Sequence, residues 1–385
     1  MNQLVLHIGP PKTETSTFQH WLLDNADVLS ERGIAFPGGL VRPFGNCARI
    51  AHALLPDGQT PQKFMRFKGF FADFARENAD KTVVLSTEYW ASLLRGHRTP
   101  GNLQVTWDDT TNTPSSALRP QQRSIDTAVA LRKNARDMGF DKIHLALMIR
   151  DPVEWCSARY LQQFKTFHDV EKILAERVET IPLSSCRDGF EVLSRMGFTI
   201  SYDAFRAPDN GDHLCKRLME LCGCADAIKD DISFAGTTKN TSPGYLKAIG
   251  MGHIRFLFEE QVPDLEQDAD VLRARALAKI IEDHPLDGDQ KFVLFPQDVA
   301  VALQERQAML MQGMDAFAQG PSADKVAQSF ARPAPQSPLC WAQLDGDEQA
   351  KIQTWLKTIT AAVAASETLA PLFETGAIQD IANTR

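Results

Sequence analysis

The chain lacks the segments that would direct it to or across a membrane. No apolar run approaches the ~20 residues that a membrane-spanning helix needs. No basic region near residue 1 is followed by an apolar stretch and a small-residue cleavage site, so we expect no secretory signal. The seven cysteines are scattered, and an odd number without regular spacing does not indicate a disulfide framework. These absences predict a protein of the reducing cytoplasm.

The chain also lacks cysteines at the spacing of a zinc site, and it has no excess of positive charge. Cys222 and Cys224 are separated by one residue and have no second pair, so no metal site is predicted. The formal net charge of −8 argues against a surface for nucleic acid. An anionic ligand would therefore need a local basic pocket. The length of 385 residues suits one large α/β domain or two smaller ones.

The most informative segment follows a short apolar run near the start of the chain. Residues 4–8 predict a buried strand, residues 9–11 (GPP) a tight turn, and the apolar positions of 18–22 a helix. Between the turn and the helix stand a lysine and four hydroxyl residues: Lys12, Thr13, Thr15, Ser16 and Thr17. Unpaired backbone N–H groups at a helix start carry partial positive charge. The segment therefore predicts a cradle for phosphate or sulfate.

Strands and helices alternate along the first half of the chain. Further strands are predicted at 33–37, 82–86 and 142–149, and helices at 46–55, 62–78 and 122–138. This alternation predicts an α/β fold with a central parallel sheet flanked by helices. Ligands in such folds bind at the carboxyl ends of the strands. Three strand ends are thus expected to converge on one site: Gly9 to Thr17, Ser86 to Glu88, and Arg150 to Tyr160.

The domain organisation is predicted from composition. Residues 1–330 are expected to form one α/β domain, interrupted by a long excursion at 96–122 that is rich in Thr, Pro, Asn and Gly. Beyond residue 165 the pattern is mainly helical, with a strand predicted at 198–201. The run ARPAPQSP at 331–338 indicates a linker, so 331–385 is predicted to be a linker with a helical appendage.

With these three strand ends, the chain resembles the sulfotransferases that use 3′-phosphoadenosine 5′-phosphosulfate (PAPS), and is similar to bacterial, carbohydrate-sulfotransferase-like members. The resemblance implies a P-loop-like fold and covers about the first 165 residues. Residues 11–17 (PKTETST) are similar to the family's 5′-phosphosulfate loop, and residues 147–152 (LMIRDP), with Ser157 and Tyr160, are similar to its 3′-phosphate site. Residues 85–88 (LSTE) are similar to a Ser-x-Glu strand end of the family. Residues 239–242 (KNTS) are more weakly similar to a later element near the nucleotide.

The resemblance implies roles that physical chemistry supports. Sulfuryl transfer needs positioning and charge neutralisation more than covalent help. Lys12 would neutralise charge on the departing nucleotide, and the hydroxyl residues of 13–17 would bind phosphate and sulfate oxygens. Arg150 offers a planar fork for the 3′-phosphate, with Ser157 two helical turns further on. No metal is implied, and the acceptor would be a carbohydrate, a lipid or another small molecule.

The identity of the general base is left open by the sequence. Glu88 is one candidate to remove the acceptor proton, although a carboxylate at a strand end can also cap the next helix. His7 is the other candidate, although a histidine on a buried strand is commonly a satisfied core residue. Arg150, in turn, could pair with Asp151 or Glu154 rather than bind a ligand.

Two residues depart from the family pattern. Glu14 stands where the family has glycine, and a carboxylate a few ångströms from a phosphosulfate would be repelled by about 1 to 4 kcal/mol. We expect Glu14 to point outward. Eight residues after Arg150, where the family has a helical serine, this chain has Ala158, with Ser157 just before it.

Two other functions are considered. The first is a P-loop nucleotide kinase or NTPase, but Gly9 lies only three residues before Lys12 and no glycine immediately precedes the lysine, unlike G-x-x-x-x-G-K-[ST]. The second is a non-catalytic protein that has kept the sulfotransferase fold, with Glu14 impairing the cofactor loop.

Overall fold

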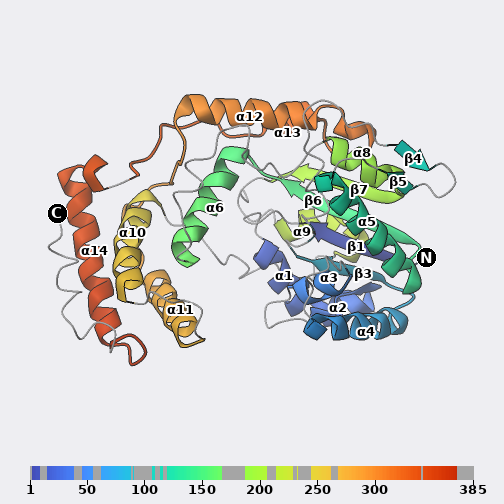
Figure 1. Ribbon diagram of the computed structural model, residues 1–385, viewed down its shortest axis with the longest axis horizontal. Helices are drawn as coiled ribbons and strands as arrows, with labels where there is room; N and C mark the ends of the chain where they lie inside the picture. The colour runs from blue at the N-terminus through green and yellow to red at the C-terminus, as the bar shows by residue number, and fades with distance from the viewer. Residues whose placement is uncertain are drawn as a thin grey trace. The chain divides into compact units, whose positions relative to one another are not determined.

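The computed structural model describes residues 2–8, 15–38, 46–54, 62–87, 90, 106–108, 113–115, 119–166, 187–205, 214–228, 232, 244–261, 268–339 and 341–370 (Figure 1). The chain divides into two compact units. Unit 1 comprises residues 1–155, 182–240 and 303–331, and unit 2 comprises 156–181, 241–302 and 332–385. The predicted division at residue 330 stays a prediction, and residues 332–385 fall in the same unit as 241–302.

Unit 1 is built on a five-stranded parallel sheet with the order β2-β3-β1-β6-β7. Its strands are β1 (Gln3–Ile8), β2 (Ile34–Ala35), β3 (Thr82–Ser86), β6 (Lys142–Ile149) and β7 (Phe198–Ala204). The first strand is central, so Leu6 pairs with Leu85 on one side and with Leu145 on the other. The predicted α/β fold with a central parallel sheet is confirmed.

The strands form because their sequences are apolar on both faces. Leu4, Val5 and Leu6 are fully buried, and in β6 every residue after Lys142 is buried. Continuous apolar runs of this kind suit a parallel strand that helices cover on both sides. The outer edge of β7 is also covered, because Tyr202 N donates to Gln319 O at 2.8 Å and Gln319 N donates to Ile200 O at 2.8 Å.

Helices cover the two faces of the sheet. One group consists of α1 (Thr15–Asp24) and α9 (Leu214–Leu221), which contact each other. The second group consists of α3 (Ala48–Leu54), α4 (Gln62–Glu77) and α5 (Arg119–Asp137). In this second group, α3 contacts both α4 and α5. Right-handed crossovers between parallel strands place these groups on opposite faces. The segment that connects β1 to β2 thus crosses one face of the sheet. The segments that connect β2 to β3 and β3 to β6 cross the other face. The carboxyl end of β1 is therefore a topological switch point, where such folds bind ligands.

Three aromatic side chains of α4, Phe67, Phe71 and Phe74, are spaced to lie on one face of the helix and pack against the core. Phe71 is fully buried and stacks on Phe140 with ring centroids 6.1 Å apart, and Phe67 is 5% exposed. Phe74 is partly buried against the same core. The predicted excursion at 96–122 stays a prediction, and within it β4 (Thr106–Asp108) and β5 (Thr113–Ser115) pair in an antiparallel ladder. Strands of three residues are too short to show an alternating pattern in the sequence.

All regular structure described in unit 2 is helical, which confirms a largely helical C-terminal part. Helix α14 (Gly346–Ala364) contacts α10 (Tyr245–Gln261) and α11 (Asp268–Asp283), and Ile352, Trp355, Leu356 and Ile359 form its buried face. The remaining elements are α2 (Ala26–Glu31), α6 (Pro152–Thr166), α8 (Arg187–Arg195), α12 (Gln297–Met311), α13 (Ala323–Gln328), η3 (Ala225–Ala227), η4 (Met314–Ala316) and η5 (Trp341–Gln343). Across the described segments, no helix has the length and apolar character to cross a membrane.

Candidate anion site at the carboxyl edge of the sheet

The predicted site residues divide into those that the structure describes and those that it does not. His7, Thr15, Ser16, Thr17, Arg150 and Ser157 are described. Lys12, Thr13, Glu14, Glu88 and the segment 239–242 lie outside the described residues, so their predicted roles stay predictions. The parallel pairing brings the carboxyl ends of β1, β3 and β6 to one edge, where His7 is level with Ser86 and Ile8 with Leu147.

His7 and Ser86 form a buried pair on neighbouring strands. Both side chains are fully buried, and His7 Nδ1 lies 2.8 Å from Ser86 Oγ. Burial lowers the pKa of the His7 imidazole to about 3, so the ring is neutral at ordinary pH. Within the part of the chain that the structure describes, the other ring nitrogen, Nε2, is buried and has no hydrogen-bond partner.

The first turn of α1 buries two of its hydroxyl residues. Thr15 is 2% exposed and Thr17 is 4% exposed, whereas Ser16 is half-buried. The Thr15 hydroxyl oxygen is buried without a hydrogen-bond partner among the described residues. A buried polar group without a partner costs about 1–3 kcal/mol, so such groups in a native fold call for an explanation. At a helix start, a bound oxyanion would supply the missing acceptor.

Arg150 follows β6 and is held on two sides. Its Nε lies 3.6 Å from Glu154 Oε2, and its guanidinium carbon lies 5.1 Å from the centroid of the Phe205 ring. The side chain is 18% exposed. The ion pair with Glu154, one of the two alternatives from the sequence, is therefore present. An arginine stacked on an aromatic ring keeps its planar fork in a fixed orientation, which also suits binding of a phosphate.

Asp151 is buried, caps the start of α6 and accepts its hydrogen bonds from groups of the protein itself. Its Oδ1 accepts from Val153 N at 2.8 Å and Glu154 N at 3.4 Å, and its Oδ2 accepts from Gln304 Nε2 at 2.8 Å and Ala331 N at 3.0 Å. Burial raises the pKa of this carboxyl, and the hydrogen bonds oppose that effect. The sequence signal for this role is an aspartate directly before a proline at the first helical position, and α6 does begin at Pro152.

Ser157 belongs to unit 2, whereas Arg150 belongs to unit 1. Its side chain is 5% exposed, and its hydroxyl oxygen accepts a hydrogen bond from Leu294 N at 3.2 Å. This contact gives the serine a structural role within unit 2. The predicted contact of Ser157 with a 3′-phosphate stays a prediction.

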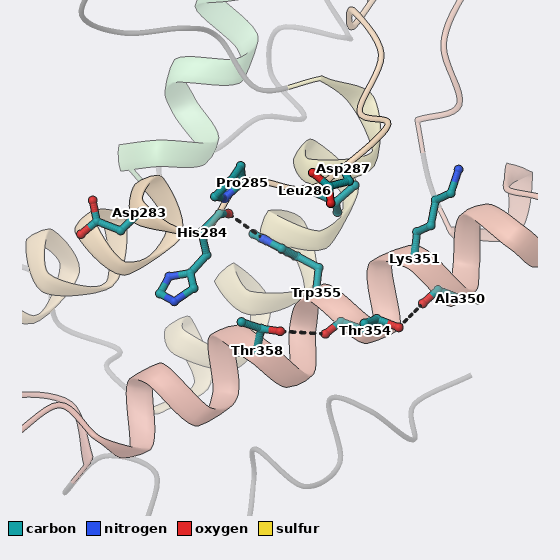
Figure 2. Close-up of a pocket in the computed structure, with 10 residues that line it drawn as sticks. All are labelled: Asp283, His284, Pro285, Leu286, Asp287, Ala350, Lys351, Thr354, Trp355 and Thr358. Carbon is teal, nitrogen blue, oxygen red and sulfur yellow. Dashed lines mark hydrogen bonds between the residues drawn. The ribbon is translucent and has the colours of Figure 1, made fainter.

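Unit 2 contains a separate pocket of about 480 Å³ between the end of α11 and α14 (Figure 2). Its polar groups bond mainly within the protein: His284 Nδ1 donates to Ile280 O at 2.7 Å, and Trp355 Nε1 donates to His284 O at 2.9 Å. The Thr354 and Thr358 hydroxyls donate back to carbonyls of their own helix. The chemistry of this pocket is therefore less distinctive than that of the sheet edge.

The described residues contain no group of three or more His, Cys, Asp or Glu side chains arranged to hold a metal ion. At this edge of the sheet, the polar atoms His7 Nε2 and Thr15 Oγ1 have no hydrogen-bond partner among the described residues, and the guanidinium of Arg150 is held in a fixed orientation. Sequence reasoning missed Ser86 as the partner of His7, and only the register of β1 against β3 reveals it. The chain matches no protein-family model, no curated protein and no solved structure.

Proposed function

We propose that the protein is a sulfotransferase that moves a sulfuryl group from PAPS to a hydroxyl or amine of a carbohydrate, lipid or small-molecule acceptor. The observation that carries the proposal is that, among the described residues, two buried polar atoms near the switch point of the parallel sheet, His7 Nε2 and Thr15 Oγ1, have no hydrogen-bond partner. Such a site suits an oxyanion. The sulfuryl chemistry itself is proposed from the resemblance of residues 11–17, 85–88 and 147–152 to sulfotransferase motifs.

The proposed reaction is a direct, in-line transfer. The acceptor oxygen or nitrogen forms a bond to sulfur while the bond between sulfur and the bridging oxygen of the 5′-phosphate breaks. Lys12 stabilises the negative charge that develops on that bridging oxygen. Arg150 binds the 3′-phosphate, with its fork oriented by Phe205.

Glu88 is the general base that removes the proton of the acceptor in this proposal. A general base works best when its pKa lies near the working pH. Burial lowers the pKa of His7 to about 3, so this imidazole is a weak base. Glu88 is therefore the better of the two candidates that the sequence offers.

The deciding experiment compares two lysine variants. Lys12→Ala is expected to lower kcat with PAPS by about 100-fold or more, as the loss of one charge-stabilising group does. Lys142→Ala is the matched control, because Lys142 is an exposed residue at the opposite end of the sheet and should leave turnover unchanged. Unchanged turnover in Lys12→Ala would refute the assignment of the loop.

Calorimetry separates the alternatives. Micromolar, metal-free binding of adenosine 3′,5′-bisphosphate, the desulfated product, is expected. Tight binding of ATP with Mg²⁺ would instead favour a nucleotide kinase or NTPase, which a central first strand followed by a helix would also suit. Binding of neither ligand would favour a non-catalytic protein.

A further inference from the structure

The protein has two buried histidines in its sheet, and their surroundings differ. His144 on β6 has partners at both ring nitrogens, with Nδ1 at 3.2 Å from Gln3 Nε2 and Nε2 at 2.8 Å from Ser201 Oγ. His7 on β1 has a partner at Nδ1, where Ser86 Oγ lies at 2.8 Å. Its fully buried Nε2 has no partner in the described segments. Within the described residues, the fold supplies a partner for both ring nitrogens of His144 and for one ring nitrogen of His7.

The bond to Ser86 fixes the position of the proton on the His7 ring. If the Ser86 hydroxyl donates to Nδ1, the ring proton is on Nε2, and one buried donor is left unmatched. If Nδ1–H donates to Ser86 Oγ instead, both the serine proton and the bare Nε2 are left unmatched. Each unmatched buried group is costly. The tautomer with the proton on Nε2 is therefore the favoured one.

A second unmatched group lies on the same side of the sheet. The His7 ring meets the Phe18 ring edge-on, with centroids 4.9 Å apart and an interplanar angle of 84°. Thr15 lies three residues before Phe18, so both side chains are on the face of α1 that meets β1. The Thr15 hydroxyl is also buried and unpartnered among the described residues. Both groups therefore belong to the contact between β1 and α1, and the first turn of α1 carries the positive end of the helix dipole, which suits an oxyanion.

We propose that His7 is a binding residue that donates its Nε2–H to an oxyanion held at the first turn of α1, with the Thr15 hydroxyl as a second donor and Ser86 fixing the tautomer. The identity of the oxyanion rests on the proposed function, in which it is the phosphosulfate end of PAPS. Burial keeps the ring uncharged by lowering its pKa to about 3. His7 then orients the group to be transferred, and it takes no proton from the acceptor.

The test measures binding of adenosine 3′,5′-bisphosphate and of inorganic pyrophosphate by metal-free calorimetry. His7→Phe removes both nitrogens and should weaken binding about 10- to 100-fold, the usual effect of losing a hydrogen bond to a charged group. His7→Gln places an amide N–H near the position of Nε2 and should keep the affinity within about threefold. His144→Gln is the control for loss of a buried histidine and should bind as the native protein does.

A second measurement does not depend on any variant folding. Nitrogen NMR of the native protein with labelled histidine should show the His7 proton on Nε2, and a proton on Nδ1 would overturn the proposal. Equal affinity of His7→Phe and the native protein for both anions would also overturn it, as would the absence of any anion binding. If pyrophosphate binds in a His7-dependent way and the adenosine nucleotide does not, the oxyanion site stands and the sulfotransferase function fails.

Discussion

The buried imidazole of His7 should make the stability of unit 1 depend on pH. In the folded chain burial lowers the pKa of His7 from 6.5 to about 3, so between these values the unfolded chain binds one more proton at this residue. Stability rises with pH wherever the unfolded state binds more protons. The contribution of His7 is therefore fully present above pH 6.5 and is lost as the pH falls towards 3.

The size of the effect follows from the same two values. Well below the unfolded pKa, one extra proton on the unfolded chain costs about 1.4 kcal/mol of stability for each pH unit. Between pH 7 and pH 4.5 the accumulated loss is about 2.5 kcal/mol. Other groups also titrate: the lowered pKa of His144 acts in the same direction, and the raised pKa of Asp151 acts in the opposite one. The informative quantity is thus the difference between the native protein and a His7 variant.

Urea unfolding, followed by tryptophan fluorescence at several pH values, measures this difference. Trp21 is a suitable reporter because it is fully buried in unit 1 and its ring stacks on Phe18, which contacts His7. The native protein should lose about 2.5 kcal/mol more than His7→Gln between pH 7 and pH 4.5. Parallel curves for the native protein and His7→Gln would refute the reasoning.

Two further predictions concern unit 2. Asp289 accepts hydrogen bonds from Gly244 N, Leu246 N and Lys247 N at the start of α10, so Asp289→Ala should lower the free energy of unfolding by about 2 kcal/mol in calorimetry; a value under about 0.5 kcal/mol, the range of neutral surface changes, would contradict the cap. A Cβ at Gly250 would lie 2.7 Å from Trp355 Cζ3, so Gly250→Ala should cost about 1–3 kcal/mol through overpacking of α10 against α14. In a chain that also carries Trp355→Leu, the Gly250→Ala change should cost much less. If the losses of unfolding free energy of the two single variants simply add in the double variant, the predicted clash of the new Cβ with Trp355 is contradicted.

Local patterns in the sequence predict the elements of the sheet but not their order. The runs at 4–8, 82–86 and 142–149 are similarly apolar, so nothing in them indicates that the first lies between the other two. Strand order depends on how the helical connections pack, and that information is distributed over the chain. The same limit hides the bond between His7 and Ser86, whose residues are 79 positions apart and meet only through strand register.

The candidate site shows the same division. Pro152 is a local signal for a helix start, and α6 begins at this residue. Asp151 is different, because only its contacts with α6 are local, and its other partners are Gln304 and Ala331. A sequence pattern can therefore predict that this aspartate caps a helix, but not that it also joins segments more than 150 residues apart.

The pairing of Gln319 with β7 has a consequence for how the protein is made. Unit 1 includes residues 303–331, and Gln319 in this segment pairs with the outer edge of β7 through Ile200 and Tyr202. During synthesis this edge is exposed while the more than 100 residues between them are translated. Exposed strand edges pair readily with other chains. The nascent protein therefore has its greatest tendency to aggregate after the sheet strands have been made and before residue 319 emerges, when a chaperone that covers strand edges would raise its yield most.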